Sequence, residues 1–192
     1  MTAVLWALLA LAYPPEIKPW MLPAEEQRKA LTLAYLEAHR GPDALTGDGE
    51  ADVRMVPKVV VVHWTGGGTA KSAWNTFAPA TLGGRQYLQK AGALNVGAHF
   101  LVDRDGTIYQ LLEEDRIARH CIGLNHLSIG IENVGDGAGN ALTGAQLAAN
   151  AFLVQELAGR HPITHLIGHH EYRSMEPHPY FSELDPKYRT VK

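Results

Sequence analysis

The sequence lacks several features that would point to other classes of protein. It has one cysteine, Cys121, in 192 residues, so no disulfide bond can form within the chain. Its formal net charge is -3, and a nucleic-acid partner would require a basic surface instead. No apolar run approaches the roughly 20 residues of a membrane span. With 46% hydrophobic residues, the chain is expected to fold as a globular domain around a sizeable core.

The N-terminus is the most apolar stretch. Residues 3–12 form a run with the length of a signal-peptide core, and Ala10-Leu11-Ala12 supplies an A-x-A cleavage pattern, although no basic residue precedes the run. We therefore expect residues 1–12 to be a signal peptide and the protein to be exported, to the periplasm or the extracellular space. The alternative is a hydrophobic helix packed on the domain.

The remaining chain is predicted to comprise an N-terminal helix and loop, residues 13–57, and a main domain, residues 58–192. Pro23 is expected to open the helix, and its acidic first turn and basic last turn suit the helix dipole. Gly41-Pro42 is expected to stop it.

Hydrophobic patterns in the main domain predict an α/β fold with a mixed central β-sheet flanked by helices. Asp105-Gly106 between two apolar runs predicts a hairpin. Thr143 is expected to cap a helix whose apolar face includes Leu147, Ala151, Val154 and Leu157. Strands are predicted at residues 58–63, 99–103, 107–112, 128–134 and 163–167, and a short helix near residues 71–77.

Two histidines stand where buried strands end. Residues 59–62 are valines, which indicates a strand buried on both faces, and His63 follows them directly. His169 follows the strand predicted at 163–167. Two such imidazoles could converge on one metal ion, and a hydrolytic zinc needs about three protein ligands with one position open. His170 and His165 are rival candidates for the second ligand.

Other polar residues suggest the rest of a site. Glu132 lies in an otherwise apolar strand, where a carboxylate is unfavourable unless it has a partner or faces a cleft. It could deprotonate a water molecule, or it could simply face solvent. His120 and His126 flank a turn-like loop, residues 121–125, and could hydrogen-bond a polar substrate, although either could equally be a surface residue. Trp64 suits packing better than stacking on a substrate.

Five stretches together resemble the type-2 family of zinc-dependent N-acetylmuramoyl-L-alanine amidases, which is related to peptidoglycan recognition proteins and T-odd phage lysozymes. They occur in the family's order over roughly residues 58–192. The stretches are Val-Val-His63-Trp-Thr, Asn95-Val-Gly-Ala-His99-Phe-Leu-Val-Asp-Arg-Asp-Gly-Thr-Ile, Ala118-Arg-His120-Cys-Ile-Gly, Asn125-His-Leu-Ser-Ile-Gly-Ile-Glu132-Asn-Val-Gly and Leu166-Ile-Gly-His169.

The resemblance implies a function and a set of roles. His63 and His169 would bind zinc, Glu132 would assist the attacking water, and His120 would lie in the substrate cleft, with Trp64 and Asn125 as further substrate contacts. The implied reaction is hydrolysis of the amide bond between N-acetylmuramic acid and L-alanine in bacterial peptidoglycan or a soluble muropeptide. The alternative is a module that binds peptidoglycan without cleaving it.

The sequence departs from the family at its C-terminal end. The third zinc ligand of bacterial members is an aspartate in a Lys-Thr-Asp-Pro-Gly-like stretch, and Lys192 resembles the lysine of that stretch, which would stabilise an oxyanion. The aspartate would follow two residues after Lys192, so we expect a truncated amidase domain. Asp185 is the nearest substitute.

Overall fold

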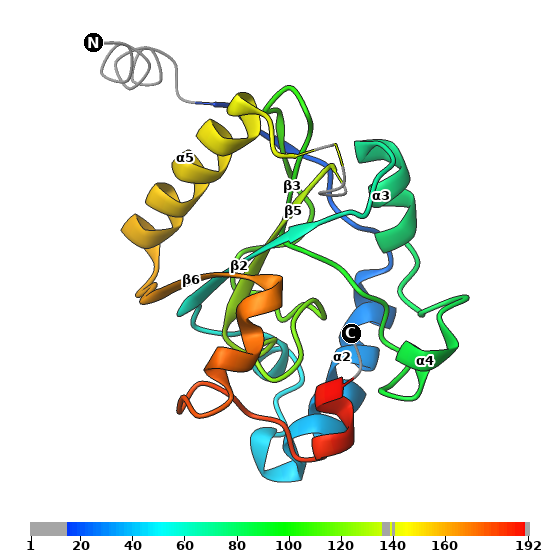
Figure 1. The fold of residues 1–192 in the computed structure, drawn as a ribbon. Helices are drawn as coiled ribbons and strands as arrows, with labels where there is room; N and C mark the ends of the chain where they lie inside the picture. Colours follow the sequence, from blue (N-terminus) through cyan, green and yellow to red (C-terminus); the bar gives the residue numbers. More distant parts are fainter. Residues whose placement is uncertain (1–14, 136–138, 140, 191–192) are drawn as a thin grey trace.

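A computed structural model describes residues 15–135, 139 and 141–190. The predicted signal peptide at 1–12 and Lys192 lie outside these residues. The described chain forms a six-stranded mixed sheet in the order β1-β4-β3-β5-β2-β6 (Figure 1).

The strands are β1 Ile17–Pro19, β2 Val59–Trp64, β3 Phe100–Val102, β4 Ile108–Gln110, β5 Ser128–Asn133 and β6 His165–Gly168. The α-helices are α2 Glu25–Arg40, α3 Ala70–Phe77, α4 Gln86–Gln89 and α5 Gly144–Arg160. Short 3-10 segments are η1 Pro42–Ala44, η2 Ala51–Val53, η3 His169–Met175 and η4 Pro186–Thr190.

The predicted mixed α/β sheet is confirmed. β3, β5, β2 and β6 run parallel, and β3 pairs with β4 in the antiparallel hairpin expected around Gly106. Edge strand β1 was not predicted. It pairs parallel to β4, with Ile17 opposite Ile108, and so joins the segment 13–57 to the same sheet as the main domain.

Helix α5 begins where the sequence predicts, but it buries a different face. Thr143 Oγ1 accepts a hydrogen bond from the Gln146 backbone N–H at 3.0 Å, and the Gln146 side chain accepts one from the Thr143 N–H at 3.1 Å. Leu147 and Ala151 are exposed, whereas Leu153 and Leu157 are buried. The predicted face is therefore wrong in part. The buried face of α5 includes a polar residue, Gln146, which the hydrophobic pattern does not indicate. The Gln146 amide donates to the carbonyl oxygens of β3 and of the segment after β5.

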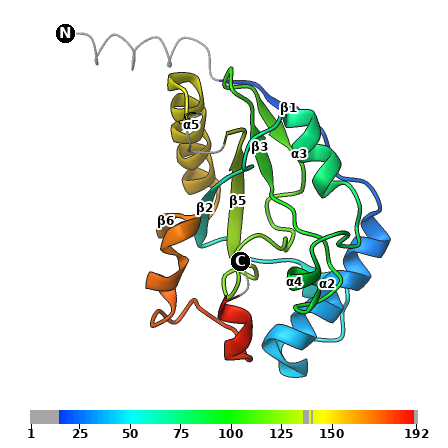
Figure 2. The same ribbon diagram turned by 45° about the vertical axis from the view of Figure 1, so that its right-hand side comes forward.

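The two faces of the sheet have different surroundings. Val60, Ile129 and Ile131 belong to one core cluster with Leu153 of α5, and we call this side the α5 face. Alternation along the strands sends Val59, Val61 and His63 of β2 and Glu132 of β5 to the other side, the cleft face. Helices α3 and α4 lie on the cleft side, opposite α5 (Figures 1 and 2), whereas α2 contributes Tyr35 to the cavity lining and Leu36 to the core cluster that includes Leu153. Among the described residues, no helix is long and apolar enough to cross a membrane.

Candidate active site

A cavity of about 750 Å³ opens on the cleft face. Its floor is the C-terminal end of β2 and β5, where residues 62–66 and Glu132 line it. Its walls come from parts of residues 73–98 and 119–125, and residues 168–172 complete its rim. Ligands in α/β sheets commonly bind at the carboxyl ends of parallel strands, and this cavity has that position.

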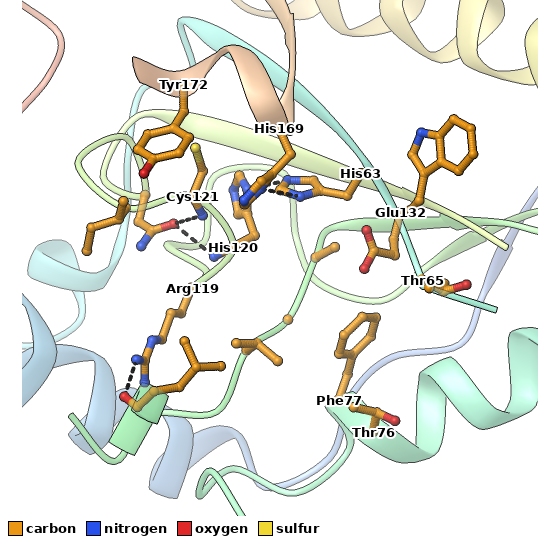
Figure 3. Close-up of a pocket in the computed structure, with 18 of the residues that line it drawn as sticks. His63, Thr65, Thr76, Phe77, Arg119, His120, Cys121, Glu132, His169 and Tyr172 are labelled. Carbon is orange, nitrogen blue, oxygen red and sulfur yellow. Dashed lines mark hydrogen bonds between the residues drawn. The ribbon is translucent and has the colours of Figure 1, made fainter. Parts of the chain in front are cut away.

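Sheet topology brings His63 and His169 together. β2 and β6 are neighbouring parallel strands with Val62 opposite Gly168, so the histidine after each of these residues leaves the sheet at the same edge. The two Nδ1 atoms lie 2.9 Å apart (Figure 3). Two nitrogens on one tetrahedral zinc would be about 3.3 Å apart, given bonds of 2.0–2.1 Å. The pair therefore needs little adjustment to share a metal ion.

The rival histidines have other surroundings. His165 Nδ1 lies 2.8 Å from Thr164 Oγ1, and its ring packs against His178 and Tyr180, so it does not line the cavity. The expectation that strand alternation turns His165 to the other face is wrong, because His165 pairs with Val59 and so shares the face of His63. It lies outside the cavity because it is at the N-terminal end of β6, away from the end that lines the cavity. His170 lines the cavity, but its ring centroid lies 6.1 Å from that of His169 in an edge arrangement.

Burial lowers the pKa of two histidines of the cleft, His63 and His120. It lowers the pKa of His63 well below its usual range, and the neighbouring His120 and His169 lower it further. Burial likewise lowers the pKa of His120 to about 3. His99, behind His120, is a buried histidine with both nitrogens bonded. Its Nε2 lies 2.7 Å from the Arg116 carbonyl oxygen, and its Nδ1 accepts from a backbone N–H. Neutral imidazoles are the form that binds metal.

Glu132 stands beside the histidine pair. His63 and Glu132 are partners in the β2–β5 register, so their side chains emerge on the same face from adjacent strands (Figure 3). Among the residues that the structure describes, Glu132 Oε2 is buried without a hydrogen-bond partner. Burial raises the pKa of this carboxyl to about 8, and Arg85 opposes the shift. Glu132 is thus a partly buried residue of the cavity lining with one buried carboxyl oxygen, rather than a fully solvent-facing glutamate.

Asn125 holds the loop that carries His120. Its Oδ1 accepts hydrogen bonds from the backbone N–H groups of His120 and Cys121, at 2.8 and 2.7 Å, and its Nδ2 donates to Tyr35 Oη at 2.9 Å. Asn125 is only 4% exposed. These bonds are all to protein groups, so substrate binding by Asn125 stays a prediction while its structural role is visible.

Trp64 is the last residue of β2, lies at the cavity and is 41% exposed, although alternation along β2 sends its side chain to the face opposite that of His63. This exposure argues against the packing role that the sequence favours. Tyr87 of α4 also lines the cavity and is 56% exposed. The aromatic ring of Tyr87 is thus available to a bound substrate.

Two buried arginines support the cleft wall. Arg28 of α2 donates to the carbonyl oxygens of Phe77 and Ala78, at 3.0 Å each. Arg119 donates to three carbonyl oxygens within residues 88–94. The wall has little regular structure, and these bonds satisfy backbone groups that a sheet would otherwise pair. Neither arginine could be recognised from the sequence as a buried support, since arginine is normally exposed.

The described residues bring two imidazole nitrogens, from His63 and His169, together at this site. Within residues 15–135, 139 and 141–190, no group of three or more histidine, cysteine or acidic residues is placed to hold a metal ion. Asp185, the substitute ligand considered from the sequence, pairs with Lys187 at 2.6 Å and does not line the cavity. It is therefore not the third ligand in this arrangement.

Comparison with known proteins identifies the family. The sequence profile described as N-acetylmuramoyl-L-alanine amidase matches residues 53–180. The chain belongs to this family. The matched region contains the cavity floor, His63, Glu132 and His169.

Individual relatives agree with this assignment. The endolysin of Enterobacteria phage K11 is 35% identical over 92 residues, and that of Escherichia phage T7 is 36% identical over 92 residues. Each alignment covers 45% of this chain and 61% of the relative, so the chain spans about three fifths of the length of these relatives. A solved structure of an AmpD derivative is 25% identical with a TM-score of 0.53, and 88% of this chain and 91% of that chain align. The amidase LysC from Clostridium intestinale is 24% identical with a TM-score of 0.50, over 64% and 76% of the two chains, and shows the same fold.

Proposed function

We propose that this protein is a zinc-dependent amidase that hydrolyses the bond between N-acetylmuramic acid and L-alanine in peptidoglycan or its soluble fragments. Family membership supports the reaction type. The observation that carries the proposal is the pairing of two Nδ1 atoms, 2.9 Å apart, with an unpaired carboxyl on the neighbouring strand.

The residues present fit zinc. Neutral imidazole is a preferred zinc ligand, and both rings present nitrogen to the same point. An orphaned carboxyl oxygen beside them is costly in a metal-free protein but useful next to a cation. The proposal requires a further ligand from outside the described residues. When bound, zinc would polarise the scissile carbonyl and lower the pKa of a water molecule.

Glu132 is the proton carrier in this proposal. Its raised pKa, about 8, lies close to neutral pH, where a group can both accept and release a proton. A nearby cation would favour the ionised carboxylate that accepts a proton from water. Glu132 would then deliver the proton to the nitrogen of the leaving L-alanine. Stabilisation of the oxyanion by Lys192 stays a prediction.

The cleft suits a glycopeptide. Its lining includes Trp64, the exposed ring of Tyr87, and Arg85. Aromatic faces can pack against a sugar ring or lactyl group, while a guanidinium can bind a carboxylate of the peptide stem. The substrate is a cell-wall component, so the proposal also includes export to the periplasm or the extracellular space.

One observation favours a second function. The described residues contain no group of three side chains placed to hold a metal ion. A non-catalytic module that binds peptidoglycan would need no such group. Such a module would retain the cleft and bind muropeptide without turnover. Metal content and turnover of a purified muropeptide separate the two functions.

The decisive variant is Glu132→Gln. This change keeps the shape of the side chain and removes its basicity, so zinc should stay bound while turnover falls by roughly 10²–10⁴. The measurement is release of stem peptide from a muropeptide, with zinc determined by elemental analysis. Glu26→Gln, on the exposed first turn of α2, is the matched control and should leave turnover unchanged. Turnover near the parent level in Glu132→Gln would exclude Glu132 as the base, and a zinc-free parent that binds muropeptide without cleaving it would establish the second function.

A further inference from the structure

The ring of His120 lies between a metal-facing histidine and the backbone of β5. Its Nδ1 is 3.0 Å from His63 Nε2, and its Nε2 is 3.0 Å from the Ser128 carbonyl oxygen. Each nitrogen of His120 therefore has a defined partner within the protein, which is unusual for a side chain whose role is to bind substrate.

The position of the His120 proton follows from its partners. Nε2 faces two oxygens of Ser128, the carbonyl at 3.0 Å and Oγ at 3.3 Å. The Ser128 hydroxyl donates its own proton to the Leu124 carbonyl oxygen at 2.8 Å, so it can only accept from His120. Nε2 must therefore carry the proton. In a neutral ring, Nδ1 is then the unprotonated nitrogen and an acceptor.

This assignment determines the tautomer of His63. Because His120 Nδ1 accepts, His63 Nε2 donates to it, and the lone pair of His63 is left on Nδ1. That atom is the one that lies 2.9 Å from His169 Nδ1. We propose that His120 is a positioning residue that fixes the tautomer and orientation of His63 so that Nδ1 is available to metal. This inference rests on the zinc site of the proposed function.

Contacts to both the ring and the backbone of His120 fix its position. A Cβ atom at Gly130 would lie 2.9 Å from His120 Cγ, so only glycine on β5 leaves room for the ring. At the other end, Asn125 Oδ1 accepts from the His120 backbone N–H at 2.8 Å. The second partner of a metal-binding histidine is usually a carboxylate, a backbone carbonyl or water. Here an imidazole takes that place and passes the bond on to a backbone carbonyl.

The test compares His120→Leu with His120→Gln. Leucine fills similar space without an acceptor, so zinc affinity, measured by competition with a chromogenic chelator, should fall about 10–100-fold. Glutamine offers a carbonyl oxygen to His63 and an N–H to Ser128, so it should recover most of the affinity. His165→Leu, at a histidine that does not line the cavity, is the matched control and should keep the parent affinity.

A second measurement needs no metal. Ring ¹⁵N chemical shifts of the metal-free protein distinguish the two tautomers, with His63 assigned by loss of its signals in His63→Gln. The parent should show His63 protonated at Nε2, and His120→Leu should show a mixture. Protonation of parent His63 at Nδ1, or unchanged zinc affinity in His120→Leu, would overturn the inference. A parent that binds no zinc would refute the proposed zinc site, while the shifts would still decide the tautomer. If His120→Leu does not fold, the parent shifts and His120→Gln still give the answer.

Discussion

The two faces of the sheet treat buried polar groups differently. On the α5 face, Gln146 is fully buried, but its amide donates to the Val102 and Val134 carbonyl oxygens at 3.2 and 3.0 Å. Asn150 of the same helix donates to Asn133 Oδ1 at 2.8 Å. On the cleft face, Glu132 has a buried oxygen without a partner among the described residues.

Buried polar groups with hydrogen-bond partners stabilise the fold, whereas a buried polar group without a partner lowers the free energy of unfolding. A satisfied buried amide specifies how α5 docks. An unpaired buried carboxyl costs folding free energy, and its raised pKa, about 8, reports that cost. The strands are the same on both faces, so this cost comes from the one side chain, Glu132, and from its position at the cavity.

The largest expected effect is loss of metal from the cleft face. His63→Ala and His169→Ala should each abolish stoichiometric zinc binding, because either removes one of two facing nitrogens. His165→Ala and His170→Ala should keep most of the zinc. Elemental analysis after dialysis measures this. Full zinc content in either of the first two variants would show that the convergence of these rings is structural.

A change on the α5 face should affect stability and leave metal binding intact. Leu153 is fully buried, so Leu153→Ala should lower the free energy of unfolding by about 2–5 kcal/mol. Leu147 is 56% exposed, and Leu147→Ala should stay within about 0.5 kcal/mol of the parent. Urea titration of both variants measures the difference. A larger loss in Leu147→Ala than in Leu153→Ala would mean that α5 buries the face predicted from the sequence.

The cost of the unpaired carboxyl should depend on pH in the metal-free protein. The pKa of Glu132 is about 8 when folded and about 4.5 when unfolded, so between these values the folded state holds more protons. Stability is therefore lost as the pH rises from about 4.5 to about 8, by at most about 4 kcal/mol.

The variant Glu132→Gln does not ionise and should escape this loss. Its advantage in unfolding free energy over the parent should thus grow from pH 5 to pH 8. Urea titrations at both pH values give the comparison. A constant difference between the two proteins would indicate that the carboxyl is solvated or paired.

Much of the fold could be predicted because local signals agree with tertiary structure. Valines mark β2, Asp105-Gly106 marks the hairpin, and Thr143 marks the start of α5. Edge strand β1 gave no such signal, since it is only Ile17–Pro19 and becomes a strand through pairing with β4, distant in the sequence. The α5 face was misassigned because hydrophobicity alone does not indicate that a glutamine will cap carbonyl groups.

Some residues of the candidate site could likewise be predicted from the sequence, and others depend on tertiary contacts. His63, His169 and Glu132 could be proposed because each stands at or near the end of an apolar strand. The partners of His120 could not, since its bond to His63 depends on how the loop after Arg119 folds onto β5. The support that α2 gives, through Tyr35 to Asn125, likewise depends on contacts between distant segments.

Cys121 allows the opening of the cleft wall to be measured chemically. The thiol is 1% exposed, and burial raises its pKa to about 12, so it should not react with thiol reagents while the loop is in place. Its backbone N–H is bonded to Asn125 Oδ1, so exposing the thiol means breaking the loop's own support. Because the chain has no other cysteine, the rate of its modification reports how often this wall opens. The native protein thus contains a single-site probe of cleft opening, and a bound substrate that holds the wall closed would slow the labelling.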